Sequence, residues 1–251
     1  MKQNIKTALI TGSARRIGKY LAISLAGQGY NLAISYRNSK SAATELKEYL
    51  TSNFDIKAEI FYANLEEKES VVNLSNQVMA MFGDSLTLLI NNASIFNKSQ
   101  FLDDNFGEEL ISNFNTHLFA PVILANQFIR NVKNRGLKDA NIVNIIDKNI
   151  IRYNTAYFYY LLSKKSLAEL TKMLAIAVAP FARVNAIAPG FIFNLEGNST
   201  EEENNYLNIK KSPLNHQTNP EDIWKTLQFL LENQAITGQI VSVDSGAMLI
   251  S

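Results

Sequence analysis

Short apolar runs alternate with longer amphipathic segments along this chain, and this alternation is the feature that most constrains its fold. Residues 5–11 form an apolar run of the length of a buried strand, and 16–27 follow with apolar residues at helical spacing. Similar pairs of segments recur to the end of the chain. Because parallel strands need long, usually helical, connections, the repetition predicts a parallel sheet covered by helices.

The individual elements can be placed from the apolar runs and from the residues that bound them. The expected strands span 5–11, 31–36, 56–62, 86–91, 141–146, 183–188 and 240–243. The expected helices span 16–27, 39–50, 66–81, 157–179 and 219–231, with two further helical stretches before Arg135. The last helix begins with the cap-then-proline pattern Asn219-Pro220. Two stretches fit the pattern poorly and are expected to be irregular, namely 94–104 and 191–213.

The predicted fold class is α/β. Seven strands connected by helices give a doubly wound (Rossmann) parallel seven-stranded sheet with helices on both faces, in a single domain spanning 1–251. Ligands of such sheets bind beyond the carboxyl ends of the strands. The motifs described below all lie just after an expected strand or on the helix that follows it, which is where such a ligand would bind.

Composition limits the classes of function. The chain has 251 residues, of which 47% are hydrophobic, which suits one domain with a full core. A net charge of +1 gives no reason to expect nucleic acid or a membrane surface as a partner. With no cysteine and two histidines, we expect no disulfide and no metal site. The short polar start and the absence of a long apolar run predict a cytoplasmic protein.

The segment 11–18, Thr-Gly-Ser-Ala-Arg-Arg-Ile-Gly, connects the first strand to the first helix. Glycines at such a turn let the backbone approach a pyrophosphate, and the helix start offers free N–H groups. An ordinary tight turn is the alternative for the glycines alone. Arg15 and Arg16 favour the phosphate, because cations at the positive end of a helix dipole are explained by an anionic ligand.

The second strand ends in Tyr36-Arg37-Asn38-Ser39. Enzymes that prefer NAD carry an acidic residue here to hold the ribose hydroxyls, whereas a basic residue with a hydroxyl nearby suits the 2′-phosphate of NADP. We therefore expect NADPH or NADP as the cofactor. A solvated surface charge is the alternative for Arg37.

Tyr160 and Lys164 stand four residues apart on an expected helix and so lie on one face. The ammonium is expected to favour the phenolate and to lower the pKa of Tyr160. Asp147 stands thirteen positions before Tyr160, just after a strand. An ionised carboxylate only accepts hydrogen bonds, so it would repel a ketone oxygen and attract an N–H group or a protonated imine. Unless Asp147 faces solvent, the substrate should present nitrogen donors.

These motifs together resemble the short-chain dehydrogenase/reductase family along the whole chain. The matching elements are Thr11-Gly12 with Gly18, Asn91-Asn92-Ala93-Ser94, Tyr160 and Lys164 with Ser163, Pro189-Gly190, and Asp244-Ser245-Gly246. The resemblance implies a dinucleotide cofactor, a nicotinamide near Pro189-Gly190 and a homotetramer. It also implies that Lys164 holds the nicotinamide ribose.

The chain departs from the usual family pattern at several positions. Most members have serine where Asp147 stands and glycine where Arg16 stands. Arg16, Asp147 and Phe96 together resemble the pteridine reductases and dihydromonapterin reductases, in which the aromatic ring stacks on the pterin. A core or lid aromatic is the alternative for Phe96. His117 replaces an asparagine that relays protons through water to the lysine, and a satisfied core histidine is the alternative. Asn64-Leu65 replaces the usual aspartate, and its amide can still meet the adenine.

The predicted reaction is NADPH-dependent reduction of a dihydropteridine, such as dihydromonapterin, dihydrobiopterin or dihydrofolate, by hydride transfer to a C=N bond. The proton comes from Tyr160, or from Asp147 by way of water. The nearest rival is an NADPH-dependent carbonyl reductase, such as a 3-oxoacyl reductase. A family member that binds a nucleotide without catalysis is the rival from another class.

The expected site residues fall into three groups. The catalytic group is Asp147, Tyr160 and Lys164. The substrate-binding group is Arg16, Ser94, Phe96, Asp147 and Tyr160. The cofactor-binding group is Gly12, Arg15, Arg16, Ile17, Gly18, Tyr36, Arg37, Asn38, Ser39, Asn64, Leu65, Asn92, Ala93, Ser94, Tyr160, Lys164, Pro189, Gly190 and Ile192. The cofactor-binding half is expected at about 1–150, and the catalytic helix and substrate loop at about 151–251, with 191–213 choosing among pterins.

Overall fold

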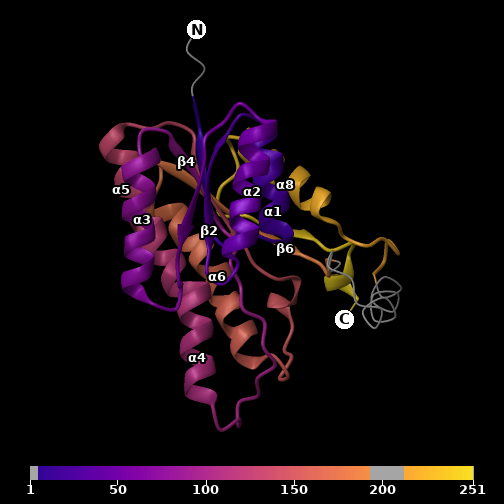
Figure 1. The fold of residues 1–251 in the computed structure, drawn as a ribbon. Coiled ribbons are helices and arrows are strands. Elements are labelled where there is room, and N and C mark those ends of the chain that lie inside the picture. The colour runs from indigo at the N-terminus through magenta and orange to yellow at the C-terminus, as the bar shows by residue number, and fades with distance from the viewer. Residues whose placement is uncertain (1–4, 193–211, 251) are drawn as a thin grey trace.

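A computed structural model of the chain describes residues 5–192 and 212–250. These residues form a parallel seven-stranded sheet in the order β3-β2-β1-β4-β5-β6-β7, as the sequence predicts (Figure 1). The strands are β1 (Thr7–Ile10), β2 (Asn31–Tyr36), β3 (Ala58–Tyr62), β4 (Leu86–Asn91), β5 (Ala140–Ile145), β6 (Ala182–Pro189) and β7 (Ile240–Val243).

Helices cover both faces of this sheet (Figure 1). Helices α1 (Arg16–Gly27), α2 (Lys40–Asn53) and α8 (Pro220–Glu232) pack on one face. Helices α3 (Lys68–Phe82), α5 (Ala120–Arg135) and α6 (Phe158–Ala177) pack on the other. Helix α4 (Phe106–Phe114) precedes α5 and contacts α6. Among the residues described, no helix combines the length and the apolar character that crossing a membrane requires.

The central strands are buried on both sides, which explains why they are continuous apolar runs in the sequence. In β4, Leu88 and Ile90 pack in the cluster under α1, α2 and α8, while Leu89 packs in the cluster under α3 and α5. Side chains alternate between the faces of a strand, so both layers of helices require apolar partners from the same strand.

Several boundaries differ from the predictions. Strand β1 is shorter at both ends than 5–11, and α6 ends at Ala177 rather than at residue 179. The two helical stretches expected before Arg135 are α4 and α5, joined without a break by a π-helical segment η1 (Asn115–Phe119), which no sequence pattern predicted. Asn219 caps α8 with a full capping box, as expected. Most of 191–213 lies outside the described residues.

The strand order reverses between β1 and β4, and the loops after these two strands are tied together. The Thr11 hydroxyl oxygen accepts hydrogen bonds from the backbone N–H groups of Asn92 and Ala93, each at 3.0 Å. The Asn92 amide donates to the backbone oxygens of Thr11 and Gly12 at 3.0 and 3.1 Å. Crevices at such switch points are where doubly wound sheets bind ligands.

Gly18 allows this close approach of the loops. A Cβ at residue 18 would lie 2.5 Å from the backbone oxygen of Gly12 and 2.7 Å from the amide nitrogen of Asn92. Both neighbours are held in place, because the Asn92 amide also binds the Gly12 oxygen. A side chain here would therefore force the helix away from the glycine loop.

We predict that Gly18→Ala destabilises the protein by about 1–3 kcal/mol, the usual cost of overpacking. The matched control is Gly107→Ala, because Gly107 lies in α4, a Cβ added there would meet no atom within 4 Å, and helices favour alanine over glycine. Urea unfolding followed by circular dichroism would measure both. Equal unfolding midpoints for the two variants would contradict the packing argument.

Candidate active site

Asp147 and Tyr160 meet at the carboxyl end of β5. Asp147 follows this strand and caps the short 3-10 helix η2 (Lys148–Ile151), where its Oδ1 accepts the backbone N–H of Asn149 at 2.7 Å. Its Oδ2 accepts a hydrogen bond from the Tyr160 hydroxyl at 2.7 Å. One carboxylate oxygen is thus fixed by the backbone and the other faces the phenol, so Asp147 is directed into the site rather than toward solvent.

Burial and the adjacent Asp147 carboxylate raise the pKa of Tyr160 well above its ordinary value. This direction is opposite to the one expected from Lys164. The Lys164 ammonium lies 5.9 Å from the centre of the Tyr160 ring and donates instead to the backbone oxygen of Ile145 at 3.0 Å. Burial and the carboxylate in direct contact with the hydroxyl therefore keep the phenol protonated. Burial lowers the pKa of Lys164 itself to about 8.

Phe96 lies beside these two residues on the loop that follows β4. Its ring meets the Tyr160 ring edge to face, with centroids 4.8 Å apart. It also stacks on Tyr157 at 4.6 Å with an interplanar angle of 10°. Phe96 is 61% exposed, which excludes a core aromatic, whereas the other alternative, a lid aromatic, stays open. An exposed ring at a site edge can offer a face to a flat ligand.

Tyr157 is a site residue that the sequence analysis missed. It precedes α6 and stacks on Phe96, which places it within the same aromatic group as Tyr160. The available signal was its spacing, because a residue three positions before Tyr160 lies on the same side of a helix start. The bridge between Ser99 and Tyr157 also joins the loop after β4 to this position.

His117 lies in η1, next to Tyr160 and nearly without exposed surface. Its Nε2 is 3.0 Å from the hydroxyl of Ser94 and its Nδ1 is 2.8 Å from the hydroxyl of Ser163. Burial, followed by the nearby Lys164 charge, lowers the pKa of His117 well below its ordinary value. The structure thus places His117 beside Ser94 and Tyr160, two residues that the sequence analysis had already assigned to the same substrate-binding group.

The predicted cofactor residues all lie along one edge of the sheet. Tyr160 and Lys164 lie on α6, and the others stand at or just after the ends of five strands, with 12–18 after β1, 36–39 at the end of β2, 64–65 after β3, 92–94 after β4 and 189–192 at the end of β6. Gly190 fits this role because a Cβ there would lie 2.8 Å from the Cα of Asp244, in the loop after β7. A dinucleotide spans several strand ends in such folds, so the arrangement fits one.

The start of α1 is suited to an anion. Its first turn carries no acidic residue, and its N-cap, Arg15, makes no side-chain capping bond. Arg15 and Arg16 are exposed and have no acidic partner among the described residues. Arg16 has a φ of +50°, in the left-handed region that favours glycine, which agrees with the glycine expected here from the family resemblance. No hydrogen bond in the described chain joins Arg16 to the Tyr160 group.

Arg37 is not a free surface charge, because its guanidinium pairs with the carboxylate of Glu66 just after β3. Glu66 was not among the predicted site residues. Its backbone is held by Asn64, whose oxygen accepts the Glu66 N–H at 3.2 Å. The Asn64 amide nitrogen donates one hydrogen to Glu67 at 2.7 Å, which leaves one N–H and one oxygen lone pair available for an adenine. Ser39 precedes α2 without a side-chain capping bond.

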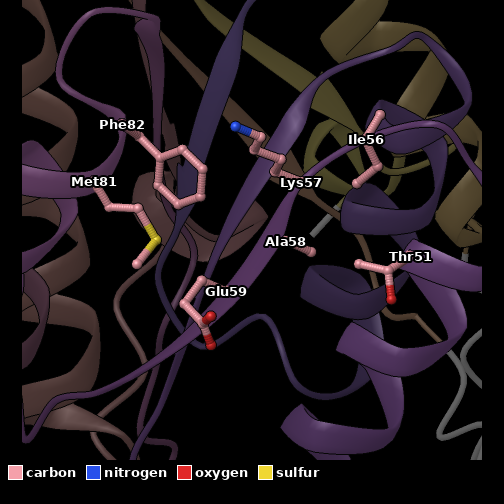
Figure 2. Close-up of a pocket in the computed structure, with 7 residues that line it drawn as sticks. All are labelled: Thr51, Ile56, Lys57, Ala58, Glu59, Met81 and Phe82. Atoms are coloured by element: carbon pink, nitrogen blue, oxygen red, sulfur yellow. The ribbon is translucent and has the colours of Figure 1, made fainter.

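One cavity of about 350 Å³ lies far from this edge of the sheet (Figure 2). Figure 2 shows Thr51 of α2 on one side and Met81 and Phe82 of α3 on the other, with residues 57–59 of the β3 start between them. The cavity thus lies at the amino end of β3, whereas Tyr160 and the glycine loop lie at the carboxyl ends of the strands. The cavity is therefore not part of the candidate active site.

Comparison with known proteins agrees with the geometry. Residues 12–248 match the family model described as enoyl-(acyl carrier protein) reductase. The chain is 30% identical to the 3-oxoacyl-(acyl-carrier-protein) reductase FabG of Staphylococcus epidermidis, with 96% of this chain and 98% of that protein covered.

Two solved structures are also similar. FolM alternative dihydrofolate reductase 1 from Brucella canis, complexed with NADP, is 32% identical with a TM-score of 0.87, covering 98% of this chain and 95% of that one. Acetoin dehydrogenase from Enterobacter cloacae is 25% identical with a TM-score of 0.88, covering 100% and 98%. The chain belongs to the short-chain dehydrogenase/reductase family, whose members are NAD(P)-dependent oxidoreductases.

Proposed function

We propose that this protein reduces a dihydropteridine, such as dihydromonapterin, dihydrobiopterin or dihydrofolate, with NADPH. The observation that carries the proposal is the carboxylate of Asp147 at 2.7 Å from the Tyr160 hydroxyl, where the family has a serine hydroxyl. A pterin edge offers amino and N–H donors that a carboxylate can accept. The similarity to FolM alternative dihydrofolate reductase 1 supports the same substrate class.

NADPH is the cofactor that suits the residues at the strand ends. Its hydride would pass to a carbon of the C=N bond, with Gly12, Gly18 and the start of α1 holding the pyrophosphate and Arg37 the 2′-phosphate. Residues 1–150 then form the cofactor-binding half, and 151–251 supply the catalytic helix and substrate loop. We further propose that the protein is a cytoplasmic homotetramer and that it has no nucleic-acid or membrane partner.

The geometry bears on the source of the proton. The raised pKa of Tyr160 makes the phenol a weaker acid than a lysine-activated tyrosine would be. Loss of the phenolic proton would also place two negative charges within 2.7 Å of each other. We therefore propose that solvent supplies the proton through Asp147, while Tyr160 keeps the carboxylate oriented. Phe96 offers its exposed face to the ring that receives the hydride.

The rival function is carbonyl reduction, which the similarity to FabG supports. A ketone oxygen needs a hydrogen-bond donor, and Asp147 removes the usual one. The decisive assay follows NADPH absorbance in parallel with dihydrobiopterin, dihydromonapterin, dihydrofolate and a 3-oxoacyl thioester. Pterin turnover with little thioester turnover supports the proposal, and the reverse result refutes it.

Asp147→Ser should lower kcat/KM for the preferred dihydropterin about 10- to 100-fold, because a charge-assisted hydrogen bond to the substrate is lost. Serine also caps helix starts, so the cap on Asn149 and the fold are expected to persist. The same substitution restores a donor for ketones, so thioester reduction should not fall. Unchanged pterin reduction in this variant would show that Asp147 does not recognise the substrate.

Arg37→Ala should weaken NADPH binding about tenfold or more and leave NADH binding unchanged, because only NADPH has the 2′-phosphate. Glu66→Gln should instead tighten NADPH binding, by about fivefold at most, because a partly exposed ion pair that competes for Arg37 is removed. Nucleotide fluorescence titration measures both affinities. Glu69→Gln is the matched control, since Glu69 is exposed in the first turn of α3. Equal shifts for NADPH and NADH would contradict the assignment of Arg37.

The pKa of about 8 for Lys164 predicts how catalysis depends on pH. Lys164 carries its charge at neutral pH and loses it as the pH rises through about 8, whereas Tyr160 stays protonated there. Because kcat/KM reports groups of the free enzyme, kcat/KM for NADPH should fall above about pH 8 with the loss of one proton. A Lys164→Arg variant, always charged, should lack this break. A wild-type profile that stays level to pH 10 would contradict the account.

A further inference from the structure

His117 hydrogen-bonds to two parts of the site. It sits in the π-helical segment η1 and is 1% exposed. On one side lies the loop after β4, which carries Ser94, Ile95 and Phe96. On the other side lies α6, which carries Tyr160 and Ser163. Further along the loop the same two parts are also joined by the Phe158 N–H, which donates to the Ser99 oxygen at 3.0 Å, and by the Tyr159 hydroxyl, which donates to the Phe101 oxygen at 3.2 Å. π-Helical turns are rare and often occur at functional sites, because they displace a side chain from its regular helical position.

The hydrogen bonds of His117 fix which ring nitrogen carries the proton. The backbone N–H of Ile95 lies 3.2 Å from Nε2, and a backbone amide can only donate, so Nε2 must be the acceptor. The Ser94 hydroxyl, 3.0 Å away, is then a second donor to the same nitrogen. In a neutral ring the proton is therefore on Nδ1, which donates to the Ser163 hydroxyl at 2.8 Å. Ser163 in turn donates to the backbone oxygen of Tyr160 at 2.8 Å.

Both ring nitrogens are thus bonded to protein groups, which leaves no site on the ring for a relay water. The Lys164 ammonium donates one of its three hydrogens to the backbone oxygen of Ile145 at 3.0 Å. A proton path through the ring of residue 117 to Lys164, as in relatives with asparagine here, would require a ring nitrogen to give up its bond to the protein. The contacts instead hold the loop against the helix.

The aromatic rings show what this connection positions. The rings of His117 and Phe96 both meet the Tyr160 ring edge to face. Their centroids lie 5.5 Å and 4.8 Å, respectively, from the centroid of the Tyr160 ring. Phe96 follows Ile95 directly, so the bond from the Ile95 N–H to His117 fixes the backbone from which the Phe96 side chain extends. A shift of this loop would move the proposed stacking ring relative to Tyr160.

We propose that His117 is a positioning residue that holds the Phe96 loop against the catalytic helix as a neutral, Nδ1-protonated imidazole, and that it does not relay protons. The inference rests on the proposed function in one respect only, namely that the substrate ring that stacks on Phe96 is a pterin. It assigns substrate affinity, rather than the proton transfer step, to residue 117.

The charges around His117 are consistent with a neutral ring. Lys164 is the nearby cation and, after burial, the second cause of the lowered pKa of His117. Tyr160 faces the ring as a neutral phenol, and Asp147 lies beyond it. Protonation of Nε2 would point a hydrogen at the Ile95 N–H and break the contact with the loop. The contribution of this contact to stability is therefore present above pH 6.5 and is lost as the pH falls toward the lowered pKa.

The first test needs no substrate. The chain has two histidines, so nitrogen-15 NMR of the imidazole rings in wild type and His216→Asn assigns the signals of His117 unambiguously. We expect the Nδ1-protonated tautomer, unchanged at pH 6.5, where an ordinary histidine is half protonated. An Nε2-protonated or a charged ring at that pH would overturn the proposal, whatever the substrate of the enzyme is.

The second test uses two variants that each keep one half of the contact. Glutamine at 117 places an acceptor near the position of Nε2, and asparagine places a donor near that of Nδ1. His117→Gln should keep KM for the dihydropterin near the wild-type value. His117→Asn should raise KM about tenfold, because bonds to the loop are lost, with little change in kcat or in NADPH affinity.

A proton relay predicts the opposite pattern. His117→Asn would then retain kcat, because asparagine is the relay residue of relatives, while His117→Gln would lower kcat without raising KM. That result would overturn the positioning role. If wild type reduced no pterin, the proposed function would fail, and the NMR experiment would still decide the state of His117. The NMR experiment also decides the state of His117 if the variants do not fold.

Discussion

Tyr160 donates its phenolic hydrogen to Asp147 at 2.7 Å, and the chemistry of the site depends on this contact. It makes the position after β5 an acceptor of hydrogen bonds, where a serine would offer a donor. Together with burial, it raises the pKa of Tyr160. A site with these properties suits a substrate with a nitrogen-rich ring better than it suits a ketone. The loops at the strand ends, which would hold the dinucleotide, still follow the pattern of the family.

The fold produces this contact from segments far apart in the sequence. Asp147 follows β5, Phe96 follows β4, and Tyr160 lies on α6. Parallel strands all end at the same edge, so loops that follow neighbouring strands converge there. The glycine loop, tied to the loop after β4 by Thr11 and Asn92, occupies the adjacent switch point. The proposed cofactor and substrate residues therefore share one edge of the sheet.

The sequence predicted the architecture well, because buried parallel strands are continuous apolar runs. β2, β4 and β7 have the predicted bounds, and the sheet has the predicted seven strands. Strand ends were less predictable, since they depend on pairing with neighbours. The pairing of Arg37 with Glu66 and the π-helical position of His117 could not be predicted from spacing, because each depends on contacts between distant segments. The pKa of Tyr160 was predicted in the wrong direction, because the sequence analysis gave the effect to Lys164, whereas burial and the Asp147 carboxylate raise it.

A crystal structure of the enzyme with NADP and a bound dihydropterin would test the central claim most directly. The account predicts that a carboxylate oxygen of Asp147 accepts a hydrogen bond from the amino or N–H edge of the ring, with the ring stacked on Phe96. It also predicts that Tyr160 stays within hydrogen-bonding distance of Asp147. A structure in which Asp147 is turned away from the ring, or in which the ring binds outside this pocket, would contradict it.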